Sequence, residues 1–171
     1  MPTALAGELK YFIADTERGW VGILGSNSGL RQTTLPCPRA EEAERRLGDV
    51  LKGATFYKKP FAGLVERLKS YLAGKRVDFP DAVDLSTATP FQRRVWQLTR
   101  LIPYGETRSY GWIASHLGKT GAVRAVGQAL AKNPLPIIIP CHRVVAGDGN
   151  LSGYSGGIEM KRYLLRREAA P

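Results

Sequence analysis

The stretch SYGWIASHLGKTGAVRAVGQALA, residues 109–131, predicts two short helices joined by a tight turn. Ser109 is a good N-cap for a first helix over residues 110–117, which Gly118 then ends. Beyond the turn, small and apolar residues predict a second helix over residues 122–131. Two short helices around a glycine-containing turn form the helix-turn-helix pattern, which is typical of DNA-binding proteins but also occurs in other helix pairs.

The second predicted helix has unusually small side chains. Its alanines and Gly127 allow a close approach to another surface, which is a neighbouring helix in many proteins and a groove wall in a DNA-binding protein. Arg124 is the only charged residue within this helix. A lone arginine on a helix is ordinarily solvated, so its meaning depends on the rest of the chain.

A second informative stretch, IIIPCHRVVAG, covers residues 137–147. Its apolar start predicts a buried strand, and Cys141 lies just past that strand, followed by His142 and Arg143. A neighbouring base and positive charge both favour the thiolate, which is the nucleophilic form of cysteine. The stretch therefore predicts a reactive thiol, and the alternative is a small, inert core cysteine.

Composition indicates a globular protein with a real core. The chain has 171 residues, 43% hydrophobic and 23% charged, which suits one large or two small domains. No stretch approaches the ~20 apolar residues of a membrane span, and the N-terminus lacks the pattern of a secretory signal. Cys37 and Cys141 are the only cysteines, so no disulfide framework is expected. These features predict a reducing, cytoplasmic location, on the nucleoid if the source is prokaryotic.

The net charge of +10 is concentrated in the second half of the chain. Residues 1–85 hold 13 lysines and arginines and 11 acidic residues, whereas residues 86–171 hold 12 and 4. A basic half-molecule favours a polyanionic partner, most often nucleic acid, over a merely soluble basic surface.

The pattern of elements predicts an α+β protein with two domains, 1–85 and 86–171. In the first, a small antiparallel sheet is expected from a hairpin over residues 11–24 and a third strand over residues 30–35. Helices are expected over residues 40–52 and 60–73. Residues 79–88 are rich in turn formers and are interpreted as a linker. The second domain is expected to be mostly helical and winged-helix-like, with the helix-turn-helix described above.

Two further helices are expected in the second domain. Thr89 as N-cap and Pro90 at the first helical position begin one that continues to Ile102. The other covers residues 158–167, and Glu168 ends it among arginines, where a surface ion pair is the ordinary interpretation.

Several motifs of this half occur together in one known family, in the same order and spacing. Pro140-Cys141-His142-Arg143-Val144 resembles the active-site signature of the 6-O-alkylguanine-DNA alkyltransferases, also called methylated-DNA–protein-cysteine methyltransferases. The further matching segments are Tyr104-Gly105-Glu106-Thr107, Ser109-Tyr110, Arg124-Ala125-Val126-Gly127, Asn133-Pro134, Tyr154-Ser155-Gly156-Gly157, and Leu164-Leu165 with Glu168. The resemblance covers about residues 89–168, whereas residues 1–85 match only in general plan.

This resemblance implies direct, irreversible DNA repair by a protein that is used once. Such a protein binds duplex DNA, flips an alkylated guanine out of the stack and transfers the alkyl group from the base oxygen to its own cysteine. In the family the helix-turn-helix docks in the minor groove, which fits a helix of small residues because a narrow groove demands close approach. The implied partner is duplex DNA with 6-O-alkylguanine, and 4-O-alkylthymine is a second candidate lesion.

The resemblance also implies catalytic roles by position. Cys141 resembles the nucleophile and alkyl acceptor. His142 resembles the base that draws its proton through a water, with Glu168 polarising the histidine. Asn133 resembles the hinge between the recognition helix and the active-site segment, and Tyr110 the residue that pushes on the target phosphate and assists the leaving base.

The DNA-contact and base-binding residues follow in the same way. Arg124 resembles the finger that fills the vacated stack. Further DNA contacts are expected from Tyr110, Ala125, Gly127 and Arg143. The pocket that reads the flipped base is expected from Val144, Tyr154 and Ser155.

The chemistry implied needs no cofactor. Transfer from an ether oxygen requires a soft nucleophile and a neutralised leaving group, which a thiolate and the Tyr110 hydroxyl can supply. Some relatives carry zinc in the N-terminal domain. Here Cys37 stands alone, with His116 and His142 both in the second half, so no metal is predicted.

Two other functions fit part of the pattern. A cysteine hydrolase using Cys141, His142 and Glu168 would turn over and would need neither a basic half nor Arg124. A non-catalytic helix-turn-helix regulator that binds lesions would not need the cysteine. For the alkyltransferase, a monomer without membrane attachment is expected.

Overall fold

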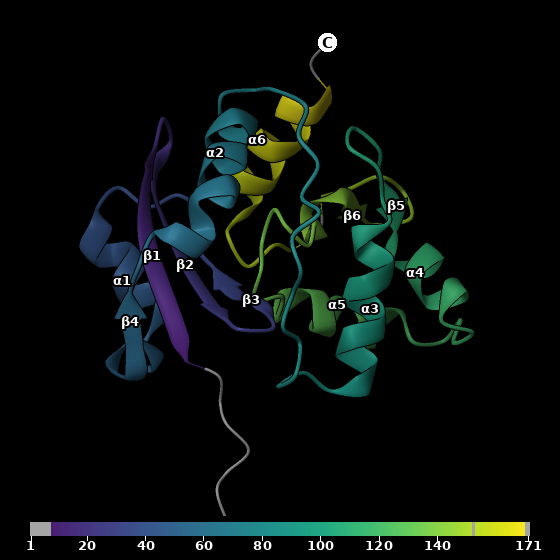
Figure 1. The fold of residues 1–171 in the computed structure, drawn as a ribbon. Helices are drawn as coiled ribbons and strands as arrows, with labels where there is room; N and C mark the ends of the chain where they lie inside the picture. The colour runs from purple at the N-terminus through teal and green to yellow at the C-terminus, as the bar shows by residue number, and fades with distance from the viewer. Residues whose placement is uncertain (1–7, 152, 170–171) are drawn as a thin grey trace, which may run out of the picture. The chain divides into compact units, whose positions relative to one another are not determined.

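The computed structural model describes residues 8–151 and 153–169 and divides the chain into two compact units, Met1–Ser86 and Thr87–Pro171. Together they form an α+β fold: a small sheet with helices in the first unit, and a mostly helical second unit (Figure 1). No helix of the described residues is long and apolar enough to span a bilayer.

The first unit is built on a four-stranded sheet in the order β3-β2-β1-β4. The strands are β1 (Leu9–Thr16), β2 (Gly19–Ser26), β3 (Gly29–Thr33) and β4 (Ala54–Phe56). The first three pair antiparallel as expected, but β4 lies parallel to β1 at the edge of the sheet. The sheet is therefore mixed, because the chain crosses over one face through a helix before β4 begins.

Helices cover both faces of this sheet. α1 (Ala40–Leu47) packs Ala43 and Leu47 against Gly22, where a Cβ atom would clash with Leu47. A short 3-10 helix (Asp49–Gly53) follows α1. A second one (Lys59–Phe61) leads into α2 (Ala62–Leu72), and Phe61 contacts the opposite face at Gly25. The unit thereby buries apolar side chains on both sides of the sheet.

Part of the expected linker belongs to the first unit. Val83 bridges to Leu30 of β3, and the Leu30 N–H donates to the Ala82 carbonyl at 2.9 Å. The Ser26 hydroxyl donates to Asp84 at 2.5 Å, and Arg67 of α2 forms an ion pair with Asp81. The interpretation of residues 79–88 as a linker was therefore wrong for residues 81–84, which bond to β2, β3 and α2.

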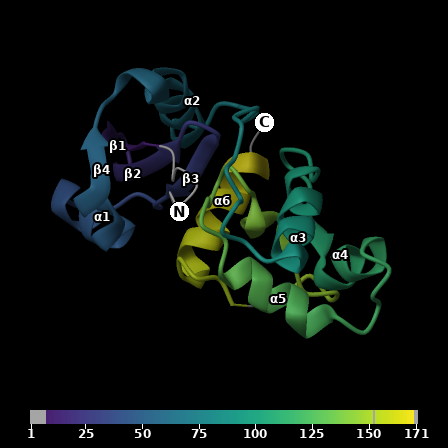
Figure 2. The same ribbon diagram turned by 60° about the horizontal axis from the view of Figure 1, so that its bottom comes forward.

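The second unit contains the expected helix-turn-helix. α3 (Pro90–Arg100) begins with a capping box in which Thr89 and Gln92 bond reciprocally. α4 (Tyr110–His116) begins at Ser109, whose hydroxyl accepts from the Trp112 N–H at 2.9 Å, and α5 (Val123–Ala131) follows. The last helix, α6 (Ile158–Ala169), extends past Glu168. Figure 2 shows α3, α4 and α5 grouped together in this unit.

The segment between α5 and α6 differs from the expectation. Residues 137–139 are buried but form a tight turn, not a strand, and Ile137 has a positive φ of 75°. A 3-10 helix (Cys141–Arg143) follows, and then β6 (Val144–Val145), which pairs parallel with β5 (Arg108–Ser109). An apolar run alone indicates burial, and the prolines at 136 and 140 bend this one into a turn.

Candidate active site

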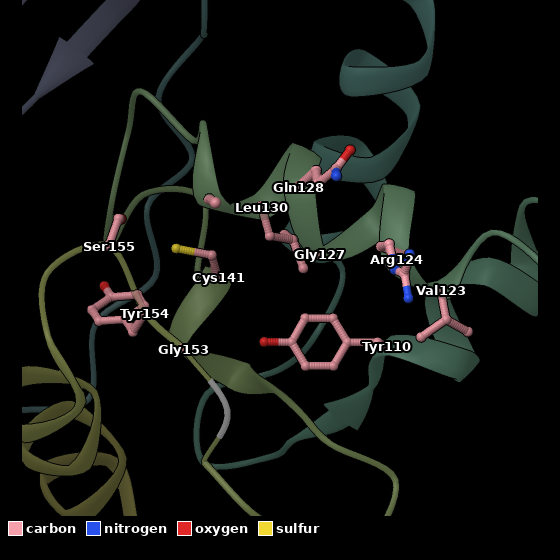
Figure 3. A pocket seen from close by; sticks show the side chains of 11 residues that line it. Tyr110, Val123, Arg124, Gly127, Gln128, Leu130, Cys141, Gly153, Tyr154 and Ser155 are labelled. Carbon is pink, nitrogen blue, oxygen red and sulfur yellow. The ribbon is translucent and has the colours of Figure 1, made fainter.

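A cavity of about 550 Å³ lies beside Cys141 in the second unit. Figure 3 shows the Cys141 sulfur directed toward Tyr154 and Ser155, with Tyr110 and Arg124 across the cavity. The lining residues come from α4, α5, the Cys141 turn and the loop before α6: Tyr110, Val123, Arg124, Gly127, Gln128, Leu130, Ala131, Cys141, Gly153, Tyr154 and Ser155. The cavity thus brings together the two sequence stretches that predicted DNA binding and a reactive thiol.

Asn133 holds the turn that carries the thiol. Its side-chain carbonyl accepts from the Leu135 N–H at 2.9 Å, and its amide donates to the Ile139 carbonyl at 2.8 Å. The same Nδ2 donates to the Cys141 Sγ at 3.1 Å. One side chain just beyond α5 therefore closes the turn and favours the thiolate.

A buried carboxylate anchors the two residues after the cysteine. Glu168 Oε1 lies 2.8 Å from His142 Nε2, and Arg143 Nε donates to Oε2 at 2.9 Å. The Arg143 fork also donates through Nη2 to Oε1 at 2.7 Å and through Nη1 to the Ile102 carbonyl at 2.7 Å. Although burial raises the pKa of Glu168, the hydrogen bonds from His142 and Arg143 outweigh it and lower this pKa to about 2.

This arrangement determines the protonation of His142. The ionised Glu168 only accepts hydrogen bonds, so His142 Nε2 carries the donated proton. Complete burial lowers the pKa of His142 despite the carboxylate, so the imidazole is neutral. Its Nδ1 is then the basic nitrogen, as a general base requires.

Opposing effects act on the pKa of the Cys141 thiol. Burial raises the pKa of Cys141, while the hydrogen bond from Asn133, the Tyr154 phenol and the charge of Lys161 each lower it. A buried thiol with several groups that favour its thiolate is stable as a thiol and ionises when a base accepts its proton.

Lys161 of α6 is a buried charged residue of the site that the sequence interpretation missed, as it also missed the lining residues Val123, Gln128, Leu130, Ala131 and Gly153. It is 1% exposed, and its Nζ donates to the Val144 carbonyl at 2.7 Å. The same Nζ lies 5.8 Å from the Tyr110 ring centroid and 5.9 Å from that of Tyr154. A signal existed: Lys161 shares one helical face with Leu164 and Glu168, and all three are buried.

The other predicted residues fall into three groups. Tyr110, Arg124, Gly127, Tyr154 and Ser155 line the cavity with Cys141. Asn133 bonds to the thiol and its turn, and Glu168 binds His142, which directly follows the cysteine. Ala125 is exposed on α5, and Val144 is fully buried in β6, where its carbonyl binds Lys161.

One DNA-contact assignment is corrected. Arg143 is 8% exposed, and its guanidinium is bound by Glu168 and the Ile102 carbonyl. Because this guanidinium is buried and held by partners within the protein, we interpret Arg143 as a structural residue of the site and not as a DNA contact.

Cys37 lies elsewhere, fully buried in the first unit beside Ile13 and Leu24. Across residues 8–151 and 153–169, no group of three or more histidine, cysteine, aspartate or glutamate side chains is arranged to hold a metal ion.

Comparisons with known proteins point to one family. Residues 90–170 match the family model described as 6-O-methylguanine DNA methyltransferase, DNA binding domain. A methylated-DNA–protein-cysteine methyltransferase of Mycolicibacterium paratuberculosis is 50% identical over 116 residues, which cover 68% of this chain and 70% of that protein. One from Salmonella typhimurium is 46% identical over 62% of each chain.

Solved structures extend the similarity to both units. The crystal structure of Mycobacterium tuberculosis OGT in complex with DNA is 40% identical, with a TM-score of 0.79 over 94% of this chain and 92% of that one. An O6-methylguanine-DNA methyltransferase from the archaeon Pyrococcus kodakaraensis is 27% identical, with a TM-score of 0.69 over 95% and 99%.

We expect Glu168→Gln to lower the free energy of unfolding by about 3–5 kcal/mol near neutral pH, because it leaves Arg143 buried without its counter-ion. The folded-state pKa is depressed, so the carboxylate contributes fully above its unfolded pKa of about 4.3 and progressively less as the pH falls toward 2. Urea denaturation over this pH range measures both effects. Glu159→Gln removes an exposed ion pair and is the matched control; an equal loss in both variants would contradict the anchoring role.

We expect Lys161→Met to raise the apparent pKa of Cys141, because a cation that favours the thiolate is lost. The rate of alkylation by iodoacetamide against pH measures this shift, in a Cys37→Ser background that leaves one thiol. Lys132→Met, at an exposed position after α5, is the control. An unchanged pH profile in Lys161→Met would show that the lysine only fills space.

Proposed function

This chain belongs to the methylated-DNA–protein-cysteine methyltransferase family, and we propose that it repairs 6-O-alkylguanine in duplex DNA by moving the alkyl group to Cys141. The observation that carries this proposal is a single cavity with a buried thiol on one side and the Arg124 helix on the other (Figure 3). A reactive thiol and a DNA-binding helix that share one cavity suit chemistry on a base that has left its stack.

The transfer step is a displacement at the alkyl carbon. His142 Nδ1 takes the thiol proton through a water, and the Cys141 sulfur forms a bond to the carbon as its bond to the guanine oxygen breaks. The departing guanine accepts a proton from the Tyr110 hydroxyl, which faces the cavity. The base is restored, the sulfur remains as a thioether, and the proton that His142 took from the thiol replaces the one that Tyr110 gave up.

In the proposed complex with DNA, the recognition helix has a defined role. We infer that α5 enters the minor groove, where Ala125 and Gly127 permit a close approach and Arg124 replaces the flipped base in the stack. Tyr154 and Ser155 then bind the base beside Cys141, and Val144 supports this wall through its bond to Lys161. Residues 86–171 serve in this proposal as the DNA-binding and alkyl-transfer domain.

The protein acts in this proposal as a monomer, because one chain supplies the thiol, the base, the anchoring carboxylate and the intercalating arginine. We place it in the cytoplasm, on the nucleoid in a prokaryotic cell. The same geometry suits 4-O-alkylthymine as a second, smaller lesion.

We expect Cys141→Ser to abolish transfer of a labelled methyl group from 6-O-methylguanine DNA while DNA binding stays nearly unchanged, because the thiol takes part in chemistry and not in phosphate contacts. The label on protein, the label released as small product, and binding by gel shift are measured together. The unchanged protein should accept one methyl group per molecule and then stop, since a thioether has no easy leaving group.

Cys37→Ser is the matched control and should transfer normally, because that residue is buried in the other unit. Release of labelled small product beyond one equivalent would instead indicate a hydrolase. Binding with neither transfer nor release would indicate a regulator.

We expect Arg124→Ala to slow repair more than it weakens binding to undamaged DNA, because the arginine stabilises the flipped state. Single-turnover transfer rates and affinities at several salt concentrations separate the two effects. A purely electrostatic arginine predicts the reverse: weaker binding to every DNA, with the salt slope reduced by about one.

A further inference from the structure

An aromatic cluster lies on the edge of the first unit's sheet, and none of its residues lines the cavity of the second unit. Phe56 of β4 is 56% exposed and Tyr57 is 43% exposed. The Phe56 ring centroid lies 5.3 Å from that of Tyr11 and 5.4 Å from that of Phe12. Large rings usually avoid water, so a cluster in which two rings remain this exposed indicates a binding surface.

Lysines surround these rings. Lys10 Nζ lies 5.2 Å from the Tyr57 ring centroid, and Lys58 Nζ lies 5.7 Å from that of Phe12. Residues 9–14 and 54–59, where β1 and β4 pair at this edge, contain three lysines and no acidic residue. The local charge is therefore strongly positive, in a half of the chain whose net charge is only +2.

The cluster rests on a fixed backbone. β4 pairs with β1 in register, with Tyr11 opposite Phe56, and the Tyr57 N–H donates to the Tyr11 carbonyl at 2.9 Å. Figure 1 shows these two strands side by side at the sheet edge. Rings held on a paired strand lose little freedom when a flat ligand stacks on them.

We propose that this edge binds single-stranded nucleic acid, with unpaired bases stacked on Phe56 and Tyr57 and phosphates near Lys10 and Lys58. Surfaces that bind single-stranded nucleic acid combine aromatic side chains with cations. Every base has a flat face that can stack on a ring, and every phosphate linkage carries a negative charge. A duplex keeps its base faces stacked, so it cannot use these rings. Protein interfaces are depleted in lysine, so the same lysines argue against a protein partner.

The site is tested with a fluorescent oligothymidylate of about ten nucleotides, a length within the usual single-strand site size. It contains no guanine, so it offers no substrate to Cys141, and failure of the alkyl-transfer proposal would leave this test unaffected. Binding to the full-length protein is measured by anisotropy with excess unlabelled blunt duplex, which occupies the helix-turn-helix. We expect oligothymidylate binding to persist under these conditions.

Substitution locates the site. Phe56→Ala with Tyr57→Ala should weaken oligothymidylate binding by at least about tenfold, whereas Phe56→Tyr with Tyr57→Phe should retain it, because the rings remain. Lys10→Met and Lys58→Met should each reduce the salt slope by about 0.7. Val50→Ala, at another exposed apolar residue of this unit, is the control and should change nothing.

Three results would overturn the proposal. The first is that blunt duplex competes away all oligothymidylate binding, and the second is that the variant with both alanines binds oligothymidylate as well as the unchanged protein. The third is that this variant loses self-association, measured by sedimentation, and keeps nucleic-acid binding. If the alanine pair does not fold, the two lysine variants and photo-crosslinking of iodouracil DNA to Phe56 or Tyr57 decide the question.

Discussion

The Glu168 carboxylate connects three segments that are far apart in the sequence. It binds His142 and Arg143 after the reactive cysteine, and Arg143 continues to the Ile102 carbonyl beyond α3. One buried anion therefore fixes α6, the cysteine turn and the end of α3 together. Glu168 also orients the His142 imidazole and keeps the proton on its Nε2. The same contacts therefore stabilise this unit and leave Nδ1 of His142 as the basic nitrogen.

The second connection lies between the thiol and the recognition helix. Asn133 follows α5 directly and bonds to Cys141, while the β5–β6 pairing holds Ser109, the cap of α4, against Val145. Both helices of the helix-turn-helix are thus joined to the cysteine segment by backbone or side-chain hydrogen bonds. In the function proposed here, a movement of α5 upon DNA binding would be transmitted to the Cys141 sulfur through the Asn133 hydrogen bond.

Local sequence patterns predicted the features that neighbouring residues determine. Ser109 and Thr89 marked helix starts because a cap needs only neighbouring residues, and Cys141 stood out because its neighbours could ionise it. Tertiary contacts decided the rest. Arg143 resembled a DNA contact until a carboxylate from α6 proved to bind it, and Lys161 looked like an ordinary helix lysine. The spacing of residues within one segment does not show which partner a buried group contacts in another segment.

The groups around the thiol also bear on why the protein is used only once in the proposed reaction. Lys161 and the Asn133 amide favour the thiolate that forms when the base takes the proton of the Cys141 thiol. After transfer the sulfur is a neutral thioether that can no longer form a thiolate, while Lys161 stays 1% exposed beside it. The added alkyl group must also fit beside the tightly bonded turn, and overpacking of this kind costs about 1–3 kcal/mol. In this proposal the reaction removes the nucleophile and adds volume at the same atom, so we expect the spent protein to be less stable than the active one.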